Sequence, residues 1–252
     1  MGINQLKKLS ENKNFYNLIR GDCLQVLPTL EDESIDLVVT SPPFNLGNTH
    51  HTGNHRFSPY NDDLPEEEYQ EKQLMILNEL HRVTKNDGSL FYQHKNRIKD
   101  GVSITPYLWL LKSKWIIKQE IVWFNRSQNF DKCRFYPMTE RIYWLAKGSE
   151  TKLFNSINKH DLWEIQPVGT KQSFTRAYPE ELVSNIIKCF EKANVVLDPF
   201  LGSGTTMKAC QTLNRNCIGI EINSDYCDIV KKRCFGTKPL DREVDYIYEE
   251  MP

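Results

Sequence analysis

Short apolar runs that end in turn-forming residues recur along the chain and predict buried β-strands. The clearest is Ile35–Thr40, with the sequence IDLVVT, which stops at a Ser-Pro-Pro sequence. Two further runs of this kind are Asn194–Asp198 and Cys217–Glu221. Strands that are apolar on both faces are typical of a parallel sheet covered by helices.

Segments with helical spacing separate these runs. Residues 65–83 open with a proline and three glutamates, and Leu74, Leu77 and Leu80 follow at helical spacing, so an amphipathic helix is predicted. A turn at Asn86-Asp-Gly88 is predicted to lead from this helix into a strand at 89–92. The remaining predicted elements are helices at 178–191 and 205–213 and strands at 115–124 and 141–145. This alternation predicts an α/β fold, with a mostly parallel twisted sheet and helices on both faces.

Composition and charge narrow the possible classes of protein. With 39% hydrophobic and 26% charged residues among 252, the chain is typical of globular proteins, so collagen and disordered classes are excluded. The net charge is -1, yet residues 124–176 hold nine Lys/Arg and five Asp/Glu, and residues 238–252 hold two and five. Binding of a polyanion therefore requires a local basic patch.

No stretch is apolar enough for a membrane span, and the first residues lack the apolar core of a signal peptide, so we expect a cytoplasmic protein without membrane contact.

Cysteine and histidine give no sign of a metal centre. The seven cysteines are odd in number and none lies in a Cys-x-x-Cys pair, which argues against a disulfide framework or a zinc ribbon. His50, His51 and His55 have no carboxylate at ligand spacing nearby, so no metal site is predicted.

We expect the five tryptophans to pack in the core rather than to serve as stacking platforms. These are Trp109, Trp115, Trp123, Trp144 and Trp163.

A glycine turn follows the strand that ends at Asp198. In the sequence DPFLGSGTT, residues 198–206, the glycines allow backbone N–H groups to approach a ligand at a helix N-terminus. Glu221 ends the next predicted strand about 20 residues later, where an acidic side chain can hold the hydroxyls of a ribose. The pair predicts a nucleoside-containing cofactor; the alternative is a tight β–α turn without a ligand. No Lys follows the second glycine as a P-loop requires.

A stiff tip follows the strand that ends at Thr40. In TSPPFN, residues 40–45, two prolines remove two backbone donors and fix φ at both positions. A hydroxyl, carbonyl acceptors and an aromatic face suit a planar ring that carries an amino group. The alternative is a proline-terminated strand with a core phenylalanine.

Together the two motifs resemble those of the amino-methylating DNA methyltransferases of the circularly permuted β group. Gly21-Asp-Cys23 and Gly219-Ile-Glu221 match as well, and the segments that begin at Glu140 and Tyr178 match more faintly. In this family the catalytic strand precedes the cofactor strand, as it does here. The resemblance implies a Rossmann-like methyltransferase fold with S-adenosylmethionine as cofactor, double-stranded DNA as substrate and a flipped-out target base. Residues 1–252 are expected to form a single catalytic methyltransferase domain.

The resemblance also implies roles for individual residues. Ser41 and the Pro42 carbonyl would accept hydrogen bonds from the target amine, and Phe44 would stack on the base, with Pro43 completing the catalytic tip. Asp22 occupies the position near the adenine of the cofactor and Glu221 the position near its ribose. The residues expected around the rest of the cofactor are Asp198, Phe200, Gly202, Ser203, Gly204 and Thr205. Cys23 is expected to be a packed side chain and not a nucleophile.

Two polar loops, at about 45–63 and 124–176, are expected to contact DNA. Asn45, Arg126, Lys132 and Arg134 are the candidate contacts, with an ordinary solvated loop as the alternative. About 30 residues, 146–175, are left for a target-recognition region, so a homodimer or a partner subunit can supplement it.

Ser41 favours the N4 amine of cytosine, because in this family a serine at that position accompanies cytosine and an aspartate accompanies adenine. A hydroxyl can also donate to a ring acceptor such as cytosine N3, but adenine N1 offers a similar acceptor, so the choice of base rests mainly on the resemblance. Adenine N6 is the alternative target, and an RNA or protein methyltransferase is a second one. A restriction–modification setting in a prokaryote or phage is expected.

Charge reversal at Lys132 and Arg134 is expected to weaken DNA binding. Lysine and arginine contacts to phosphate release counterions, so affinity should fall steeply with salt. Each lost contact should reduce the slope of log affinity against log salt concentration by about one unit. Fluorescence anisotropy titrations at several salt concentrations measure this slope, and unchanged affinity would place the DNA-binding face elsewhere.

Overall fold

The computed structural model describes residues 14–47, 61–126, 134–157, 159–168, 177–236 and 244–251. The strands are β1 (Asn14–Arg20), β2 (Ile35–Thr40), β3 (Thr84–His94), β4 (Arg97–Lys99), β5 (Val102–Ile104), β6 (Ile116–Phe124), β7 (Thr139–Ala146), β8 (Leu162–Glu164), β9 (Val195–Asp198), β10 (Asn216–Glu221) and β11 (Val244–Glu250). The α-helices are α2 (Cys23–Val26), α3 (Glu66–Val83), α4 (Tyr107–Leu110), α5 (Glu180–Lys188), α6 (Thr205–Thr212) and α7 (Ser224–Val230). A 3-10 turn follows α2 at Leu27–Thr29, and a π-helical turn follows α7 at Lys231–Phe235.

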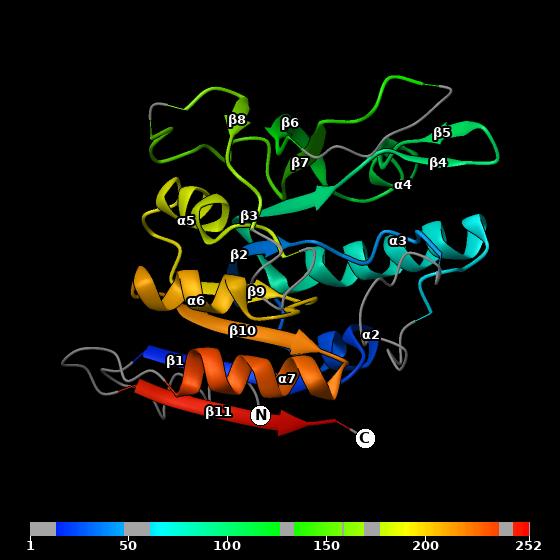
Figure 1. Ribbon diagram of the computed structural model, residues 1–252. Helices are drawn as coiled ribbons and strands as arrows, with labels where there is room; N and C mark the ends of the chain where they lie inside the picture. Colours follow the sequence, from blue (N-terminus) through cyan, green and yellow to red (C-terminus); the bar gives the residue numbers. More distant parts are fainter. Residues whose placement is uncertain are drawn as a thin grey trace.

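Within these residues a nine-stranded sheet has the order β11-β1-β10-β9-β2-β3-β7-β6-β8 (Figure 1). Neighbouring strands from β11 to β3 are parallel, whereas β7 is antiparallel to both β3 and β6. Strand β8 is parallel to β6 at the far edge, and β4 and β5 form a separate hairpin. The predicted mostly parallel α/β sheet is therefore confirmed.

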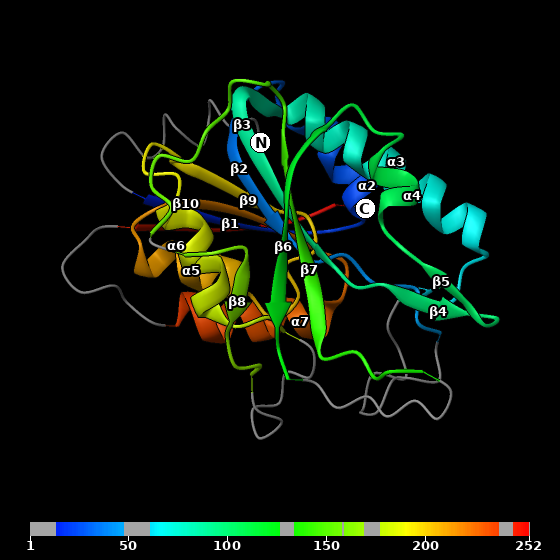
Figure 2. The same cartoon turned by 90° about the horizontal axis from the view of Figure 1, so that it is seen from above.

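Helices cover both faces of this sheet, as Figures 1 and 2 show. Buried residues of α2, α3 and α4 form one apolar core, and those of α5, α6 and α7 form the other. Strand β2 serves both cores, because Ile35 and Val38 face the first and Leu37 and Val39 face the second. Burial on both faces explains why the central strands read as continuous apolar runs.

The elements predicted from periodicity lie where expected, with one correction at β3. This strand begins at Thr84, so Asn86-Asp-Gly88 lies inside the strand and does not form the turn after α3. The register shifts between the Thr84–Ile35 pair and the Ser89–Leu37 pair, so the turn-forming residues form an irregular, bulge-like segment within β3. No helix in the described ranges has the length and apolar composition needed to cross a bilayer.

Five strands of the described residues escaped prediction from the sequence: β1, β4, β5, β8 and β11. Strand β1 precedes β2 along the chain. Strand β11 lies in the acidic C-terminal stretch and pairs with β1 in parallel at the edge of the sheet (Figure 1). Its residues are mostly half-buried, and an edge strand with polar side chains lacks the apolar signal of a central one.

The predictions for tryptophan and cysteine can be compared with burial. All five tryptophans are buried, as expected for core residues. Cys23 is also buried, and burial raises the pKa of its thiol, which suits a packed side chain. The other described cysteines are buried and form no disulfide bond with one another, and Cys133 lies outside the described residues.

The carboxyl ends of β1, β2, β9 and β10 lie at one edge of the sheet because these strands are mutually parallel neighbours. In open α/β sheets this edge is where ligands bind. The turn after β9 lies close to β10, since the N–H of Leu201 donates to the carbonyl of Ile220 at 2.9 Å. A Cβ on Gly219 would lie 2.4 Å from Leu201 Cδ2, so any other residue at position 219 would force the Leu201 side chain to move.

The substitution Gly219→Ala is expected to lower the free energy of unfolding by about 1–3 kcal/mol, the usual cost of overpacking a buried site. Urea denaturation followed by circular dichroism measures this change. The same substitution should cost less in a Leu201→Ala background, because the colliding atoms are then absent. An unchanged urea midpoint for Gly219→Ala would contradict the assigned contact.

Candidate active site

The Asp198 side chain lies at the tip of β9 and is completely buried. Its Oδ1 accepts hydrogen bonds from Thr40 Oγ1 at 2.8 Å and from the Phe200 N–H at 3.1 Å. Its Oδ2 accepts from Tyr178 at 2.8 Å and from Thr206 Oγ1 at 2.6 Å. Burial raises the pKa of this carboxyl, and these four bonds act in the opposite direction. The carboxyl group therefore joins the end of β2 to the glycine turn, to α6 and to the segment before α5.

The glycine turn adopts the backbone that its sequence predicts, since Gly202 has φ 54° and Gly204 has φ 87°. The two glycine amides are used inside the protein: Gly202 N–H donates to Glu221 Oε2 at 2.7 Å, and Gly204 N–H donates to the Leu201 carbonyl at 3.0 Å. These two N–H groups thus shape the turn, which differs from the predicted direct approach to a ligand.

Arg233 of the π-helical turn lies against the same glycine turn. Its Nη1 donates to the carbonyl of Ser203 at 3.2 Å and lies 3.3 Å from Thr205 Oγ1. Ser203 and Thr205 are both buried. The guanidinium therefore orders the two hydroxyl residues that the sequence assigned to cofactor binding.

Glu221 ends β10 next to the turn. Its Oε1 accepts from the Asn223 N–H at 2.8 Å and its Oε2 from Gly202, and the Ile222 amide also bonds the carboxylate. Burial raises the pKa of Glu221 to about 7. A carboxylate accepts about four hydrogen bonds, so capacity remains for hydroxyl groups of a ligand.

The composition of this edge fits S-adenosylmethionine. Asp198 and Glu221 are buried carboxyl groups, and neither forms an ion pair within the described residues, so a cationic sulfonium would find favourable electrostatics there. Asp22 follows β1 and caps α2 by accepting from the Leu24 N–H at 2.9 Å, with Lys72 Nζ at 4.0 Å. Phe200 is half-buried and supplies an apolar surface. Acceptors for hydroxyls, negative charge and an apolar wall are thus brought together by β1, β9 and β10.

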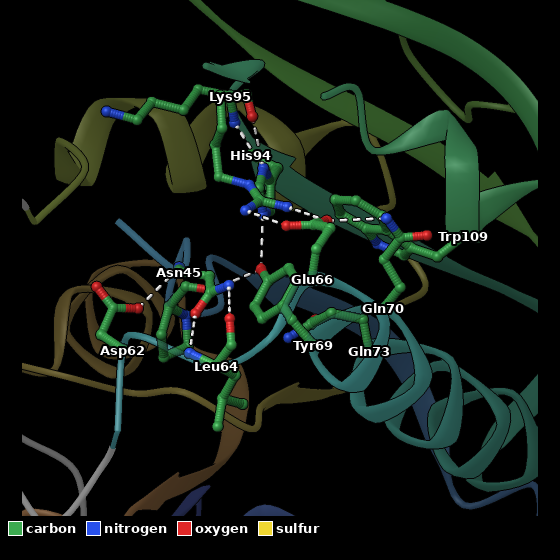
Figure 3. Close-up of polar contacts among 12 residues, drawn as sticks. Asn45, Asp62, Leu64, Glu66, Tyr69, Gln70, Gln73, His94, Lys95 and Trp109 are labelled. Atoms are coloured by element: carbon green, nitrogen blue, oxygen red, sulfur yellow. Dashed lines mark hydrogen bonds and ion pairs between the residues drawn. The ribbon is translucent and has the colours of Figure 1, made fainter. Parts of the chain in front are cut away.

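A buried chain of hydrogen bonds holds the Ser-Pro-Pro-Phe tip, and Figure 3 shows its members Tyr69, His94 and Lys95. Tyr69 of α3 donates its hydroxyl proton to the Pro43 carbonyl at 2.7 Å, and His94 Nε2 lies 2.8 Å from the same hydroxyl. His94 Nδ1 faces both backbone groups of Lys95, with the N–H at 2.9 Å and the carbonyl oxygen at 2.7 Å. A neutral His94 ring accepts from the Lys95 N–H when its proton is on Nε2 and donates to the Lys95 carbonyl when its proton is on Nδ1. Burial beside Lys95 and Arg97 lowers the pKa of His94 to about 3, so the ring is neutral.

The aromatic ring of Phe44 packs against His94 of this hydrogen-bonded chain. The centroids of the Phe44 and His94 rings are 4.5 Å apart, with an interplanar angle of 44°. Lys95 Nζ lies 5.8 Å from the Phe44 centroid. Phe44 itself is half-buried, so part of its ring remains exposed for stacking. The structure thus places Phe44 and Ser41 on one fixed tip.

Ser41 begins a second chain of side chains. Its hydroxyl donates to Gln93 Oε1, and Gln93 Nε2 donates to Glu140 Oε2. Asn125 bonds the same carboxyl, and burial raises the pKa of Glu140. Gln93 lies on β3, Glu140 lies on β7 and Asn125 directly follows β6. The hydroxyl proton of Ser41 therefore points into the protein, which removes the argument that this hydroxyl donates to a ring nitrogen of the base.

Asn45 was predicted to contact DNA, but its polar groups bond inside the protein. Its side chain donates to the Leu64 carbonyl at 2.9 Å and accepts from the Leu64 N–H at 2.7 Å (Figure 3). Its backbone N–H donates to Asp62 Oδ1 at 2.8 Å, and its φ is 55°. Asn45 thus closes the loop between β2 and α3, and the structure gives it a structural role.

Two of the predicted basic contacts lie in the described residues. Arg126 follows Asn125 directly after β6, with its guanidinium 5.6 Å from the Phe124 centroid and 3.7 Å from Glu164 Oε2. Arg134 donates to the Gly101 carbonyl at 3.2 Å. Both side chains are exposed. Lys132 and the three histidines of loop 45–63 lie outside the described residues, and the described ones contain no cluster of acidic, histidine or cysteine residues suited to a metal ion.

Sequence reasoning missed the residues that support the tip. Some of these residues lie inside helices and strands, where a single polar residue does not form a recognisable sequence motif. They are Tyr69, Gln93, His94 and Arg233. Glu140 and Tyr178 fell in faintly matching segments without an assigned role. A buried polar residue near the end of a predicted strand, as at Gln93 and His94, is the signal that could have identified two of them.

Comparison with known proteins agrees with these observations. Residues 35–232 match the N6/N4 methyltransferase family, described as DNA methylase. The type II methyltransferase M.HinfI of Haemophilus influenzae is 30% identical over 278 residues, which cover 96% of this chain and 75% of that protein. M.BglII of Bacillus subtilis is 28% identical, with 90% of this chain and 71% of that protein covered.

Solved structures show the same fold. PvuII DNA methyltransferase, which is cytosine-N4-specific, has a TM-score of 0.69 at 21% identity, with 93% of this chain and 98% of that one covered. TTHA0409 of Thermus thermophilus, complexed with S-adenosyl-L-methionine, has a TM-score of 0.69 at 20% identity, with coverage of 94% and 100%. The predicted Rossmann-like methyltransferase fold is thus confirmed. The chain belongs to the N6/N4 DNA methylase family, whose enzymes methylate amino groups of DNA with S-adenosylmethionine as the methyl donor.

Proposed function

We propose that this chain is a site-specific type II DNA methyltransferase that methylates the N4 amine of cytosine in a flipped-out base. The observation that carries the proposal is the bond between Thr40 and Asp198, which holds the catalytic tip beside the cofactor edge. Type II methyltransferases among its relatives support the restriction–modification setting. Those relatives are bacterial, which supports a role in the cytoplasm of a prokaryote.

The residues of the tip act on the target base. An aromatic amine is a weak nucleophile because its lone pair is delocalised into the ring, so acceptors that hold its protons direct that pair. Ser41 Oγ and the Pro42 carbonyl accept from the amine, and the exposed part of the Phe44 ring stacks on the base. S-adenosylmethionine supplies an electrophilic methyl group on its sulfonium. Holding amine and donor in line removes several kcal/mol of barrier, up to about 7–11 kcal/mol in model systems.

The cofactor site in this proposal is the edge formed by β1, β9 and β10. Glu221 accepts from the ribose hydroxyls, and Asp22 lies toward the adenine. Phe200, Gly202, Ser203, Gly204 and Thr205 surround the remainder. Asp198 contributes its charge and the position of the turn, because all four of its hydrogen bonds are made within the protein.

The preference for cytosine rests on Ser41 and on the likeness to the cytosine-N4-specific PvuII enzyme. Adenine N6 is the second candidate. The argument from donation to cytosine N3 no longer contributes, because the Ser41 proton is bonded to Gln93. Acceptance from an amine serves either base, so the tip alone does not select between them.

The DNA-binding face in this proposal consists of loop 45–63 and the basic stretch 124–176. Arg126 lies one residue from Asn125, which bonds the Ser41–Gln93–Glu140 chain, so the basic stretch begins beside the catalytic tip. Lys132 and Arg134 continue it along the sequence. Because the interval 146–175 is short, these loops and a second subunit contribute to recognition of the DNA sequence. The second subunit is either another copy of this chain or a different partner.

Cofactor affinity is expected to fall as the pH decreases through about 7, because Glu221 accepts ribose hydroxyls best when ionised. One pH unit below its pKa only about a tenth of the group is ionised, so the loss approaches tenfold. Isothermal titration with S-adenosylmethionine at pH 8 and pH 6 measures the change. Glu221→Gln should bind weakly at both pH values, and a wild-type dependence retained in this variant would contradict the assignment.

Expression of the protein in cells is expected to place N4-methylcytosine in their DNA, detected by nucleoside mass spectrometry. Methylated adenine without N4-methylcytosine would overturn the choice of base. Ser41→Ala and Phe44→Ala should lose methyl transfer while their affinity for S-adenosylmethionine stays at the wild-type value. Loss of both properties together would indicate misfolding, and full activity in both variants would place the catalytic tip elsewhere.

A further inference from the structure

We propose that Gln93 is a positioning residue that fixes the direction of the Ser41 hydroxyl, so that Oγ presents lone pairs and not its proton to the target amine. The inference rests on the proposed function of the Ser41 tip. It applies equally to cytosine N4 and adenine N6, because both amines are donors.

The direction of the hydroxyl follows from the far end of the chain. Glu140 as a carboxylate has acceptors only, so the group that faces it must be a donor. Gln93 therefore turns its NH₂ toward Glu140 and its carbonyl oxygen toward Ser41. A carbonyl oxygen has no proton, so the Ser41 hydroxyl must donate. Each bond thus sets the direction of the next one.

The surroundings of the chain keep this order in place. Gln93 is 3% exposed and Asn125 is 4% exposed, so water has little access to the amide groups. Burial raises the pKa of Glu140, whereas the charge of Lys95 and the amide bonds from Gln93 and Asn125 act in the opposite direction, toward the carboxylate. A rotated Gln93 amide would put its oxygen against the carboxylate, which loses that hydrogen bond, and would turn its NH₂ toward Ser41, whose hydroxyl would then accept and no longer donate.

The opposite direction would impair the reaction at the tip. A Ser41 proton aimed outward would face the hydrogens of the target amine and repel them. With the proton held by Gln93, both lone pairs of Oγ remain on the side of the base. The role of Gln93 is exerted through Ser41 and not on the base itself.

The variant Gln93→Met keeps the length of the side chain and removes both hydrogen bonds. We expect its kcat for methyl transfer to DNA to fall about a hundredfold, the scale of loss when a reacting group is misplaced by about 1 Å. Its Kd for S-adenosylmethionine should remain within twofold of wild type, because Glu221 and the glycine turn are unaffected.

A reciprocal exchange tests the order of the bonds directly. Gln93→Glu alone sets two carboxylates against each other and should lose as much activity as Gln93→Met. The double variant Gln93→Glu/Glu140→Gln restores the chain, because the carboxylate at position 93 accepts from Ser41 and from the amide at position 140. Its kcat should recover to within about fivefold of wild type. Recovery of kcat requires this donor order and does not follow from side-chain volume alone.

Gln73→Met is the matched control. Gln73 is also a buried glutamine and accepts from the Tyr92 hydroxyl at 2.8 Å, away from Ser41. We expect it to lower the melting temperature without a comparable fall in kcat. Unchanged kcat in Gln93→Met, or a double variant as inactive as Gln93→Glu, would overturn the inference while the proposed function stands. A wild-type protein that methylates neither base in DNA would overturn both.

Discussion

The architecture of the site depends on one buried carboxyl group, that of Asp198. Four donors from four segments converge on it: Thr40 at the end of β2, Phe200 in the glycine turn, Thr206 in α6 and Tyr178 before α5. A buried carboxyl is costly unless its oxygens are bonded, so the segments must meet in this arrangement for the fold to be stable. The substrate tip and the cofactor edge are consequently held at a fixed separation by the same group that the fold needs for its own stability.

Two buried chains of hydrogen-bonded side chains have different roles at the tip. The Tyr69–His94 chain holds the Pro43 carbonyl and is electrically neutral, because His94 is not protonated. The chain that leads from Ser41 to Glu140 ends in a carboxyl and sets the direction of a hydroxyl. Networks of this kind are favourable only when every member is bonded, and they then keep side chains in one orientation. Rigidity at the tip thus comes from the strands and α3 beneath it.

The sequence was sufficient to predict the central strands, α3, α5 and α6, since each has a strong apolar period and a turn signal. It also predicted that Ser41, Phe44, Asp198 and Glu221 lie at neighbouring strand ends. It did not predict β1 or β11, whose neighbours are determined by long-range pairing. Nor did it distinguish residues that would touch a ligand from those that bond internally. Asn45 and Asp198 both occupy motif positions, yet they form their hydrogen bonds within the protein. Tertiary contacts determine these bonds, and a motif does not reveal them.

The permuted order of the motifs has a consequence for how the chain folds. Strand β2 pairs with β9, although about 150 residues separate them. At the roughly 5–20 residues per second of ribosomal synthesis, β2 waits about 8–30 s for that neighbour. During this interval one edge of an apolar strand is unpaired, and the face that α5 later covers is exposed to water. Nascent chains of this protein therefore expose an unpaired strand edge, a feature that favours aggregation of partly folded chains, until β9 has been synthesised.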